Sequence, residues 1–521
     1  MTILAKAFAL YRKKPLAVLL GGVLAFYLVN NLIWLLRDTL PPAWDQAAHA
    51  DHCLTYFRLL GAPMELSLTK LLAVSSYYPP FFYACTLPAS LLFGFSCDAL
   101  AATNLLFLLI LGFSVFKIGE HFFSRAVGAG AVIITALFPM VYGLSREVLL
   151  DFSLLAMVAL AQYVILASGA GTDPKQSWLL GLVIGLTVLT KWTAVAFLPF
   201  TFLLVLWNGL KEKKRPARTV FLSLGIAVLV FLAVALPWYL KNASEFSKSA
   251  SSALYKDSVL QGDPSGFLKS ALFYWKSLRD VNVSKVLGIF VLAGLAAFVL
   301  RVRNRKALAF LMTWALPAFL VFVLVPNKDD RNIVPLLPAL AILTAAGMNA
   351  LRPLILKKSA WGLLVLAALF QFYATSFGWP LGMSHPFSHP PSQDDWKVQN
   401  ILTVLGDKRR DASYSVAVLP DMKFFNAGTF RFTSHLMRLP FHIDPMGDGP
   451  VTFEKAANYD VIISKSGRIA ARHTMAYRQN FRKDYRQALA EKDRGKFPFR
   501  LWKAFRLPDR SRAIVYVQTK E

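Results

Sequence analysis

The sequence predicts an all-α polytopic membrane domain of roughly 11–13 transmembrane helices, followed by a soluble α/β domain. Apolar runs of about 20 residues, the length that crosses a bilayer as a helix, recur through residues 1–377. The chain is 56% hydrophobic, with a mean hydropathy of +0.47. Short basic loops separate several of the runs, which stop near residue 378. We therefore expect a membrane domain over 1–377, a linker over 378–391 and a soluble domain over 392–521.

The first apolar run, 16–36, follows three basic residues at 12–14. It is longer than the core of a signal peptide and lacks a small-residue cleavage site, so we expect a retained helix with its N-terminus inside. Residues 37–80 then form the first outer loop, which gathers acids, histidines and aromatic residues at the membrane face, so we expect it to carry the functional site. Within it, 45–60 can form one amphipathic helix and 65–74 a second, both lying in the membrane interface.

Further apolar segments are candidate spans. They lie at 81–95, 100–116, 127–142, 149–167, 178–189, 193–207, in a stretch ending at 236, and at 286–300, 307–325, 333–351 and 360–377. With the first run they make twelve, whereas an N-terminus inside and a C-terminus outside require an odd number. We expect the miscounted segment to lie within residues 81–142, where either one segment is interfacial or two segments are wrongly divided.

Three loops rich in Lys and Arg, at 211–218, 301–306 and 352–358, orient the membrane domain. Short basic loops stay in the cytoplasm, so Lys191, the connection 326–331 and all residues after 377 fall outside. These loops and anionic lipid account for much of the net charge of +27, so membrane lipids are expected partners and nucleic acid is not. The three cysteines fit neither a disulfide framework nor a metal knuckle.

The last 130 residues have a different pattern. Short strands are expected at 415–419, 459–464 and 513–517, and helices at 393–405 and 477–490. From residue 391 onward, 24 Lys and Arg stand against 14 Asp and Glu. An extracytoplasmic domain of this charge could face anionic membrane or an acidic glycan. A solvated basic surface is the alternative.

Six short motifs occur in an order that characterises one superfamily. They are Trp44-Asp45-Gln46, Tyr78-Pro79-Pro80, the stretch from Ser145 to Asp151, the stretch from Leu189 to Trp192, Pro237-Trp238-Tyr239, and the stretch from Arg331 to Pro338. Over about residues 10–380 the chain resembles the GT-C glycosyltransferases of the protein O-mannosyltransferase and aminoarabinose–lipid A transferase type. The resemblance does not extend to the soluble domain.

The resemblance implies a GT-C fold and inverting transfer of a sugar from a polyprenyl-phosphate donor. The acceptor would be lipid A, a polysaccharide or a protein at the outer face of a bacterial inner membrane. Asp45 matches the acid of the family's first outer loop and is the candidate general base. Partial desolvation at the interface would raise its basicity. The alternative is that Asp45 caps the interfacial helix. Gln46 stands where relatives often carry a second acid, which argues against an acidic metal-binding pair.

Asp151 matches the acid that opens a later helix and is the second catalytic candidate. A structural ion pair between Arg146 and Asp151 is the alternative. Arg331, with Lys328 close by, is suited to hold the donor phosphate, and its alternative is a surface pair with a neighbouring aspartate. Lys191 either contacts the phosphate or extends to water.

Arg146, Tyr78 and His49 complete the candidate substrate-binding residues. His49 and His52 lie one turn apart, and with Asp45 they could hold a divalent metal, although polar loop residues are the alternative. No cofactor is otherwise expected. Among other functions, a transporter or lipid flippase fits less well, because the charged residues gather at one face and no internal repeat is visible. An oligosaccharide polymerase or ligase would use similar donors but fits the motif order less well.

Overall fold

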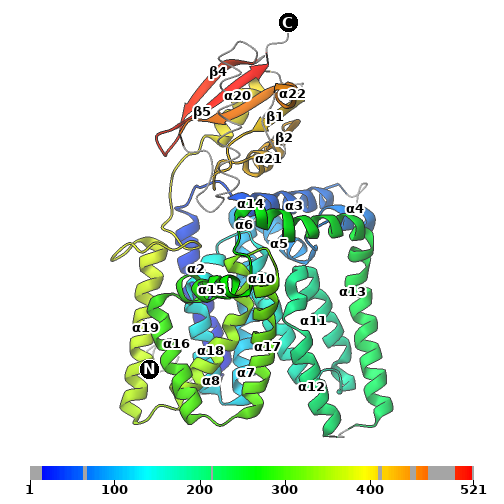
Figure 1. Ribbon diagram of the computed structural model, residues 1–521, viewed down its shortest axis with the longest axis vertical. Helices are drawn as coiled ribbons and strands as arrows, with labels where there is room; N and C mark the ends of the chain where they lie inside the picture. Colours follow the sequence, from blue (N-terminus) through cyan, green and yellow to red (C-terminus); the bar gives the residue numbers. More distant parts are fainter. Residues whose placement is uncertain are drawn as a thin grey trace.

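The computed structural model describes residues 14–62, 67–212, 215–408, 413–445, 453–467 and 499–518. A bundle of long helices forms the larger part, and a smaller domain containing a β-sheet stands on one end of it (Figure 1). We call this the α3 end, because helix α3 (Trp44–Leu60) lies across it. The predicted fold class, an all-α membrane domain followed by an α/β domain, is confirmed.

Seven helical segments in the described part of the chain are long and apolar enough to cross a membrane, or eight if one bent pair counts as a span. The seven are built on α2 (Pro15–Leu35), α7 (Asn104–Phe122), α10 (Leu150–Ala167), α13 (Ala217–Ser251), α17 (Arg305–Leu324), α18 (Leu337–Asn349) and α19 (Leu354–Phe377). The bent pair joins α15 (Phe267–Ser277) and η5 (Leu278–Asn282) to α16 (Lys285–Arg301).

This count by length is below the expected number of roughly 11–13, because the other apolar segments form shorter helices. These are α5 (Phe81–Phe93), α8 (Arg125–Leu137), α11 (Ser177–Thr190) and α12 (Pro199–Lys211), each of 13 or 14 residues. A helix of that length extends only about 20 Å. Short elements continue some of them, namely α9 (Pro139–Leu144) after α8, and η2 (Pro174–Gln176) and η3 (Trp192–Ala196) on either side of α11.

The segment 81–95 turns back instead of crossing. At its start, the Tyr83 hydroxyl lies 2.9 Å from Nδ1 of His49 on α3. After the short α6 (Cys97–Ala102), Asn104 opens α7 and donates to the carbonyl oxygen of Glu147, close to the same end. Both ends of the segment therefore stay near α3, which removes one crossing within the region where the predicted spans had the wrong parity.

The centre of the bundle is formed by α10 and α18, whose residues are mostly buried, whereas α13 exposes apolar side chains such as Phe221 and Leu229. Such exposed apolar surface is expected of helices that face lipid. Close packing depends on small residues, because a Cβ added at Gly347 of α18 would overlap the backbone of Gly294 in α16.

The two ends of the bundle differ in character. At the α3 end lie both predicted interfacial helices, α3 and α4 (Leu68–Ala73), together with η4 (Ser252–Lys256) and α14 (Asp257–Gln261) (Figure 1). The predicted start of the second interfacial helix, Glu65, lies outside the described residues. The helix pairs α12–α13, α16–α17 and α18–α19 are joined at the opposite end, so the three basic loops share that end.

The soluble domain has a five-stranded sheet in the order β2-β1-β3-β5-β4. Strand β1 (Tyr414–Val418) is parallel to β2 (Phe441–Asp444) and β3 (Val461–Lys465), while β5 (Arg512–Gln518) is antiparallel to β3 and to β4 (Phe499–Arg506). Helices α20 (Val398–Lys408), α21 (Ala427–Leu436) and α22 (Phe453–Ala457) accompany it. The three predicted strands are confirmed, and β2, β4, α21 and α22 were not predicted. The predicted helix 477–490 lies outside the described residues.

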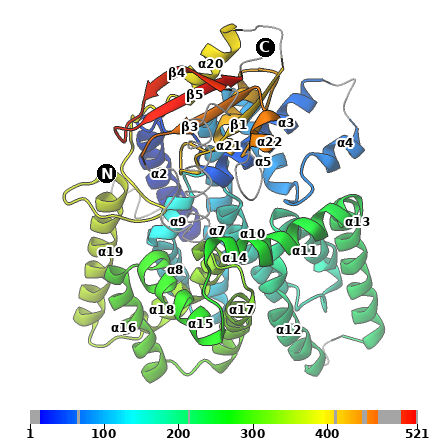
Figure 2. The same ribbon diagram turned by 45° about the horizontal axis from the view of Figure 1, so that its top comes forward.

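The linker ties the soluble domain to the bundle. Trp34, near the end of α2, donates its indole N–H to the carbonyl oxygen of His389 at 2.8 Å. Farther along, the backbone N–H of Thr39 donates to Ser392 and that of Ser392 to the Asp38 carboxylate. The domain consequently stands over the part of the bundle that contains α2 and α3, away from α12 and α13 (Figure 2).

Candidate active site

Arg331 is the centre of a charged cluster at the α3 end. It lies on η6 (Asp330–Leu336), which begins where the Asp329 carboxylate accepts the backbone N–H of Arg331 at 2.8 Å. The Arg331 guanidinium contacts three aspartates. Nη2 is 2.6 Å from Oδ2 of Asp329 and 2.9 Å from Oδ2 of Asp45, and Nη1 is 3.6 Å from Oδ2 of Asp151.

Lys191 joins the same cluster from another helix. It is the residue at which α11 ends, in extended backbone, and its Nζ lies 2.8 Å from Oδ1 of Asp151. Asp151, in the first turn of α10, therefore bridges the two cations. The start of a helix favours a carboxylate there, because the helix dipole places partial positive charge at its N-terminus. In total, three aspartates face one arginine and one lysine.

The cluster members differ in their access to solvent. The Asp151 side chain is 3% exposed, whereas that of Asp45 is 47% exposed. Asp45 is thus the carboxylate that an incoming hydroxyl group could reach, while Asp151 is suited to hold Lys191 and Arg331 in place. The side chains of Arg331 and Lys191 are 18% and 15% exposed, so neither is fully buried.

The capping alternative for Asp45 and the expected rise in its basicity are both wrong. Asp45 does not cap α3, because the N-cap is Ala43 and Asp45 lies in the first turn. Its basicity is not raised either. Burial raises the pKa of the Asp45 carboxyl, but Arg331, with a contribution from Lys191, outweighs burial and holds this pKa below its ordinary value.

The aromatic side of α3 packs on the bundle beside the cluster. His49 is buried, with Nδ1 2.9 Å from the Tyr83 hydroxyl and its ring 4.7 Å from the ring of Tyr78. Burial, together with His52, Lys191 and Arg331, lowers the pKa of His49 to about 3, although Asp45 acts in the opposite direction. His49 is therefore a neutral ring that forms part of the wall next to Asp45.

In the part of the chain that the structure describes, no group of three or more His, Cys, Asp or Glu residues is placed to bind a divalent metal. The proposed set of Asp45, His49 and His52 does not converge on one point. His49 Nδ1 is taken by Tyr83, and the His52 ring lies 5.4 Å from the Tyr83 ring. The charge that balances Asp45 is the guanidinium of Arg331.

Arg146 lies apart from the cluster. Its Nε donates to Oδ1 of Asn31 at 2.9 Å, and its guanidinium is 5.2–6.0 Å from the ring centroids of Trp34, Tyr142, Phe372 and Phe377. The suggested Arg146–Asp151 pair is not formed, because Asp151 contacts Lys191 and Arg331 instead. Arg146 thus joins α2, α9 and α19.

Lys328 is also directed elsewhere. Its Nζ donates to the carbonyl oxygens of Phe322, Val323 and Val325 at the end of α17. A cation at that position satisfies carbonyls that lack helical partners and complements the helix dipole. Lys328 therefore terminates α17 and does not contact the cluster.

Two functional candidates were not identified from the sequence. Asp329 makes more contacts with Arg331 than any other aspartate of the cluster, although it was considered only as a surface partner. The sequence feature that could have identified Asp329 is the Asp-x-Arg spacing. This spacing lets one carboxylate accept hydrogen bonds from both the backbone N–H and the guanidinium of the arginine. Glu147 is buried in the loop before α10, and burial raises its pKa to about 7.

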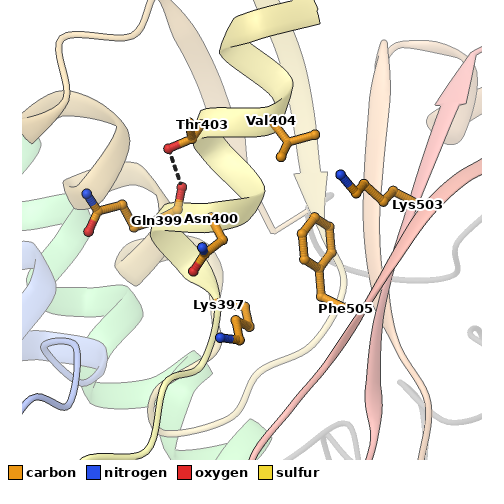
Figure 3. A pocket seen from close by; sticks show the side chains of 7 residues that line it. All are labelled: Lys397, Gln399, Asn400, Thr403, Val404, Lys503 and Phe505. Atoms are coloured by element: carbon orange, nitrogen blue, oxygen red, sulfur yellow. Dashed lines mark hydrogen bonds between the residues drawn. The ribbon is translucent and has the colours of Figure 1, made fainter.

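Two cavities of the structure lie in the soluble domain rather than at the cluster. One, of about 630 Å³, is open between α20 and β4 and is lined by polar side chains with Lys397, Lys503 and Phe505 (Figure 3). Another, of about 270 Å³, lies where β1 ends and α21 begins and is lined in part by Asp421 and Arg431.

Comparison with known proteins identifies the fold. Over 95% of its length the chain matches ArnT from Cupriavidus metallidurans. The match to ArnT bound to undecaprenyl phosphate has a TM-score of 0.57 at 13% identity and covers 97% of that chain. The match to the apo state has a TM-score of 0.59 at 14% identity and covers 98% of that chain. The archaeal oligosaccharyltransferase AglB from Archaeoglobus fulgidus, in complex with an inhibitory peptide and a dolichol-phosphate, matches with a TM-score of 0.55 at 12% identity, over 87% of this chain and 70% of that one. The chain is thus a multi-pass membrane protein with the GT-C fold that its motifs predicted.

Sequence similarity covers less of the chain than structural similarity does. Residues 78–238 match the family model described as dolichyl-phosphate-mannose-protein mannosyltransferase. This region includes Tyr78, Asp151 and Lys191, whereas Asp45 and Arg331 lie outside it. An uncharacterized protein of Aquifex aeolicus (strain VF5) is 26% identical over 313 residues, which are 51% of this chain. The match spans 58% of the length of that relative.

Proposed function

We propose that the protein is an integral-membrane inverting glycosyltransferase that moves a sugar from a polyprenyl-phosphate carrier to an acceptor hydroxyl at the outer face of the membrane. The observation that carries this proposal is the cluster in which the exposed carboxylate of Asp45 lies 2.9 Å from Arg331, with Lys191 joined through Asp151. A base and phosphate-binding cations are the two components that this single displacement requires. The fold, shared with an undecaprenyl-phosphate-bound ArnT, supports the choice of donor.

In this reaction Asp45 accepts the proton of the acceptor hydroxyl as its oxygen attacks C1 of the sugar. The bond between C1 and the phosphate oxygen breaks on the opposite side, so the configuration at C1 inverts. The phosphate leaves on its lipid with both electrons of that bond. Arg331 and Lys191 stabilise the charge that develops on it, Arg331 through the planar fork that suits phosphate.

The arrangement also couples donor binding to base strength. Arg331 is the main group that keeps the pKa of Asp45 low. A donor phosphate at Arg331 would add negative charge beside Asp45 and compete for the same guanidinium N–H groups. The pKa of Asp45 would then rise toward the value that its partial burial favours. Asp45 would become a stronger base when a donor is present.

The remaining residues have supporting roles in the proposal. Asp151 and Asp329 hold the two cations, while Tyr78 and His49 line the side of the site nearest α4 and α5. Arg146 and Lys328, which were candidates for substrate contact, stabilise the scaffold through the contacts described above. The acceptor is a lipid A, polysaccharide or protein hydroxyl. The soluble domain, which stands on the α3 end, is then extracytoplasmic in a bacterial inner membrane.

A transporter or lipid flippase is less well supported. Such proteins bind their cargo near the middle of the membrane. Here the charged cluster lies at one end of the bundle, where interfacial helix α3 meets η6 and the start of α10.

The test is Asp45→Asn, assayed with purified protein and a polyprenyl-phosphate-linked sugar. Loss of a general base lowers turnover by roughly 10²- to 10⁴-fold. Donor binding should persist, because Arg331 and Lys191 remain. The matched control is Asp280→Asn, which removes a carboxylate from an exposed pair with Arg279, and its turnover should be normal. Near-normal turnover of Asp45→Asn would reject Asp45 as the base and make Asp151 the next residue to test.

A further inference from the structure

Helix α3 lies between the bundle and the soluble domain and uses a different face for each. Asp45, His49 and Tyr56 contact the bundle, through Arg331, Tyr83 and the carbonyl oxygen of Leu71. Contacts with the soluble domain come from Trp44, Asp51 and Arg58. The spacing of seven residues places these last three on one line along the helix, roughly 100° from the face that carries Asp45.

Each residue of this outer line has a partner in the soluble domain. The indole Nε1 of Trp44 donates to Oδ1 of Asp421 at 2.8 Å, in the loop that follows β1. In the middle of the helix, Oδ1 of Asp51 lies 2.7 Å from Nδ1 of His435 on α21. Near its end, Nη2 of Arg58 donates to the carbonyl oxygen of His435 at 2.5 Å. The soluble domain therefore contacts α3 along its whole length.

The contact at Trp44 adjoins the proposed base. Trp44 is the first residue of α3 and has a φ of +22°, a backbone conformation that costs energy for a residue with a side chain. Such a conformation persists only where its surroundings enforce it. Here the surroundings include Asp421 and the start of α21, where a Cβ added at Gly428 would lie 3.7 Å from the Trp44 carbonyl oxygen. One residue before α3 begins, Ala43 follows Pro42, whose carbonyl oxygen accepts the Thr429 hydroxyl at 3.0 Å.

We propose that Asp421 is a positioning residue of the reaction, which acts through Trp44 to set the rotation of α3 and so the orientation of the Asp45 carboxylate. The inference rests on the proposed function for its catalytic consequence. Because Trp44 and Asp45 are consecutive in one rigid helical turn, a rotation that releases the indole also moves the carboxylate relative to Arg331. The soluble domain is then part of the catalytic machinery, with Asp421 acting through Trp44.

The variants that test this proposal remove or keep the hydrogen bond between the Trp44 indole and the Asp421 carboxylate. Asp421→Ala removes the acceptor, Trp44→Phe removes the donor and keeps an aromatic ring, and Asp421→Asn keeps an acceptor oxygen. Thr403→Val is the matched control in the same domain, because the Thr403 hydroxyl donates to the carbonyl oxygen of Gln399 within its own helix α20 (Figure 3). The kinetic readout is kcat and donor KM measured separately.

We expect Asp421→Ala and Trp44→Phe each to lower kcat roughly ten-fold at an unchanged donor KM, the scale of one lost hydrogen bond to a charged group. The kcat of the double variant should be close to that of either single variant, because each single variant already removes the contact through which Asp421 positions α3. Asp421→Asn and Thr403→Val should retain normal kcat. Equal losses in Asp421→Ala and Thr403→Val, or additive losses in the double variant, would overturn the proposal.

A second readout does not depend on catalysis. Hydrogen–deuterium exchange of peptides that cover the first turns of α3 should increase several-fold in Asp421→Ala and not in Asp421→Asn. If Asp45→Asn proves active while this exchange still increases, the role of Asp45 fails but the positioning of α3 by Asp421 stands. If Asp45→Asn is inactive while Asp421→Ala changes neither exchange nor kcat, the positioning role fails and the proposed base stands.

Discussion

Arg331 and Asp45 are 286 positions apart in the chain and 2.9 Å apart in the fold. Their pairing brings the first outer loop onto the connection between α17 and α18. The proposed phosphate-binding cation thus contacts the proposed base. In the proposed reaction, a donor phosphate would compete with Asp45 for Arg331 and so change the electrostatics of the site.

Removal of the Arg331 side chain should affect the donor and the base together. In Arg331→Ala, donor affinity should fall roughly 10- to 100-fold, because charge-assisted hydrogen bonds to the phosphate are lost. The pKa of Asp45 should rise, since its largest opposing charge is gone. The acidic limb of the pH–rate profile should therefore move to higher pH. Arg279→Ala, at an exposed pair with Asp280, is the control. Unchanged donor affinity together with an unchanged acidic limb would contradict both assignments.

Asp151 should matter for stability as well as turnover, because it neutralises two poorly exposed cations. Breaking such a pair by removing one partner typically costs about 3–5 kcal/mol. Asp151→Asn should therefore lower the thermal unfolding temperature of the detergent-solubilised protein. The double variant Asp151→Asn, Lys191→Met should recover part of that loss, since no lysine is then left without its carboxylate. Additive losses in the double variant would show that the Lys191–Asp151 contact is energetically unimportant.

The raised pKa of Glu147 predicts that the stability of the protein depends on pH. Burial raises this pKa to about 7 in the folded state, above the ordinary value of 4.5. Between these two values the folded state keeps a proton that the unfolded state has released, so the free energy of unfolding falls as the pH rises from about 4.5 to about 7. The full difference corresponds to about 3 kcal/mol.

The variant Glu147→Gln cannot ionise, so its unfolding temperature relative to wild type should rise between pH 5 and pH 8.5. Glu245→Gln, at an exposed pair with Lys248, serves as the control. A difference between Glu147→Gln and wild type that stays constant with pH would show that this carboxyl is not perturbed in the folded protein.

The orientation of the protein can be tested with fusions. The soluble domain and the basic loops lie at opposite ends of the bundle, and basic loops stay in the cytoplasm. A reporter that works only in the cytoplasm should be silent when fused after Glu521. The same reporter fused after Arg218, in a basic loop, should be active. A strong signal from the first fusion would place the soluble domain, and with it the charged cluster, on the cytoplasmic side.

The sequence predicted most residues of the site but not the contacts that they make. Asp45, Asp151, Lys191 and Arg331 were all expected at one face of the membrane domain, and they meet in one cluster. Arg146 was expected there because it stands five positions before Asp151. Its side chain instead packs against aromatic rings, and the residues that it contacts there lie on α2 and α19.

By itself the sequence determined the membrane class, the two-domain order and the approximate limits of most helices, because hydropathy and charge act over about 20 neighbouring residues. It also marked Asp45 and Arg331 through short motifs. Only the tertiary structure decided that Arg331 pairs with Asp45 and Asp329, that Lys328 terminates α17, and that Asp421 holds the residue next to the proposed base. The physical reason is that ion pairs and hydrogen bonds form within about 3 Å, so their partners are set by how distant segments pack and by the direction of each side chain.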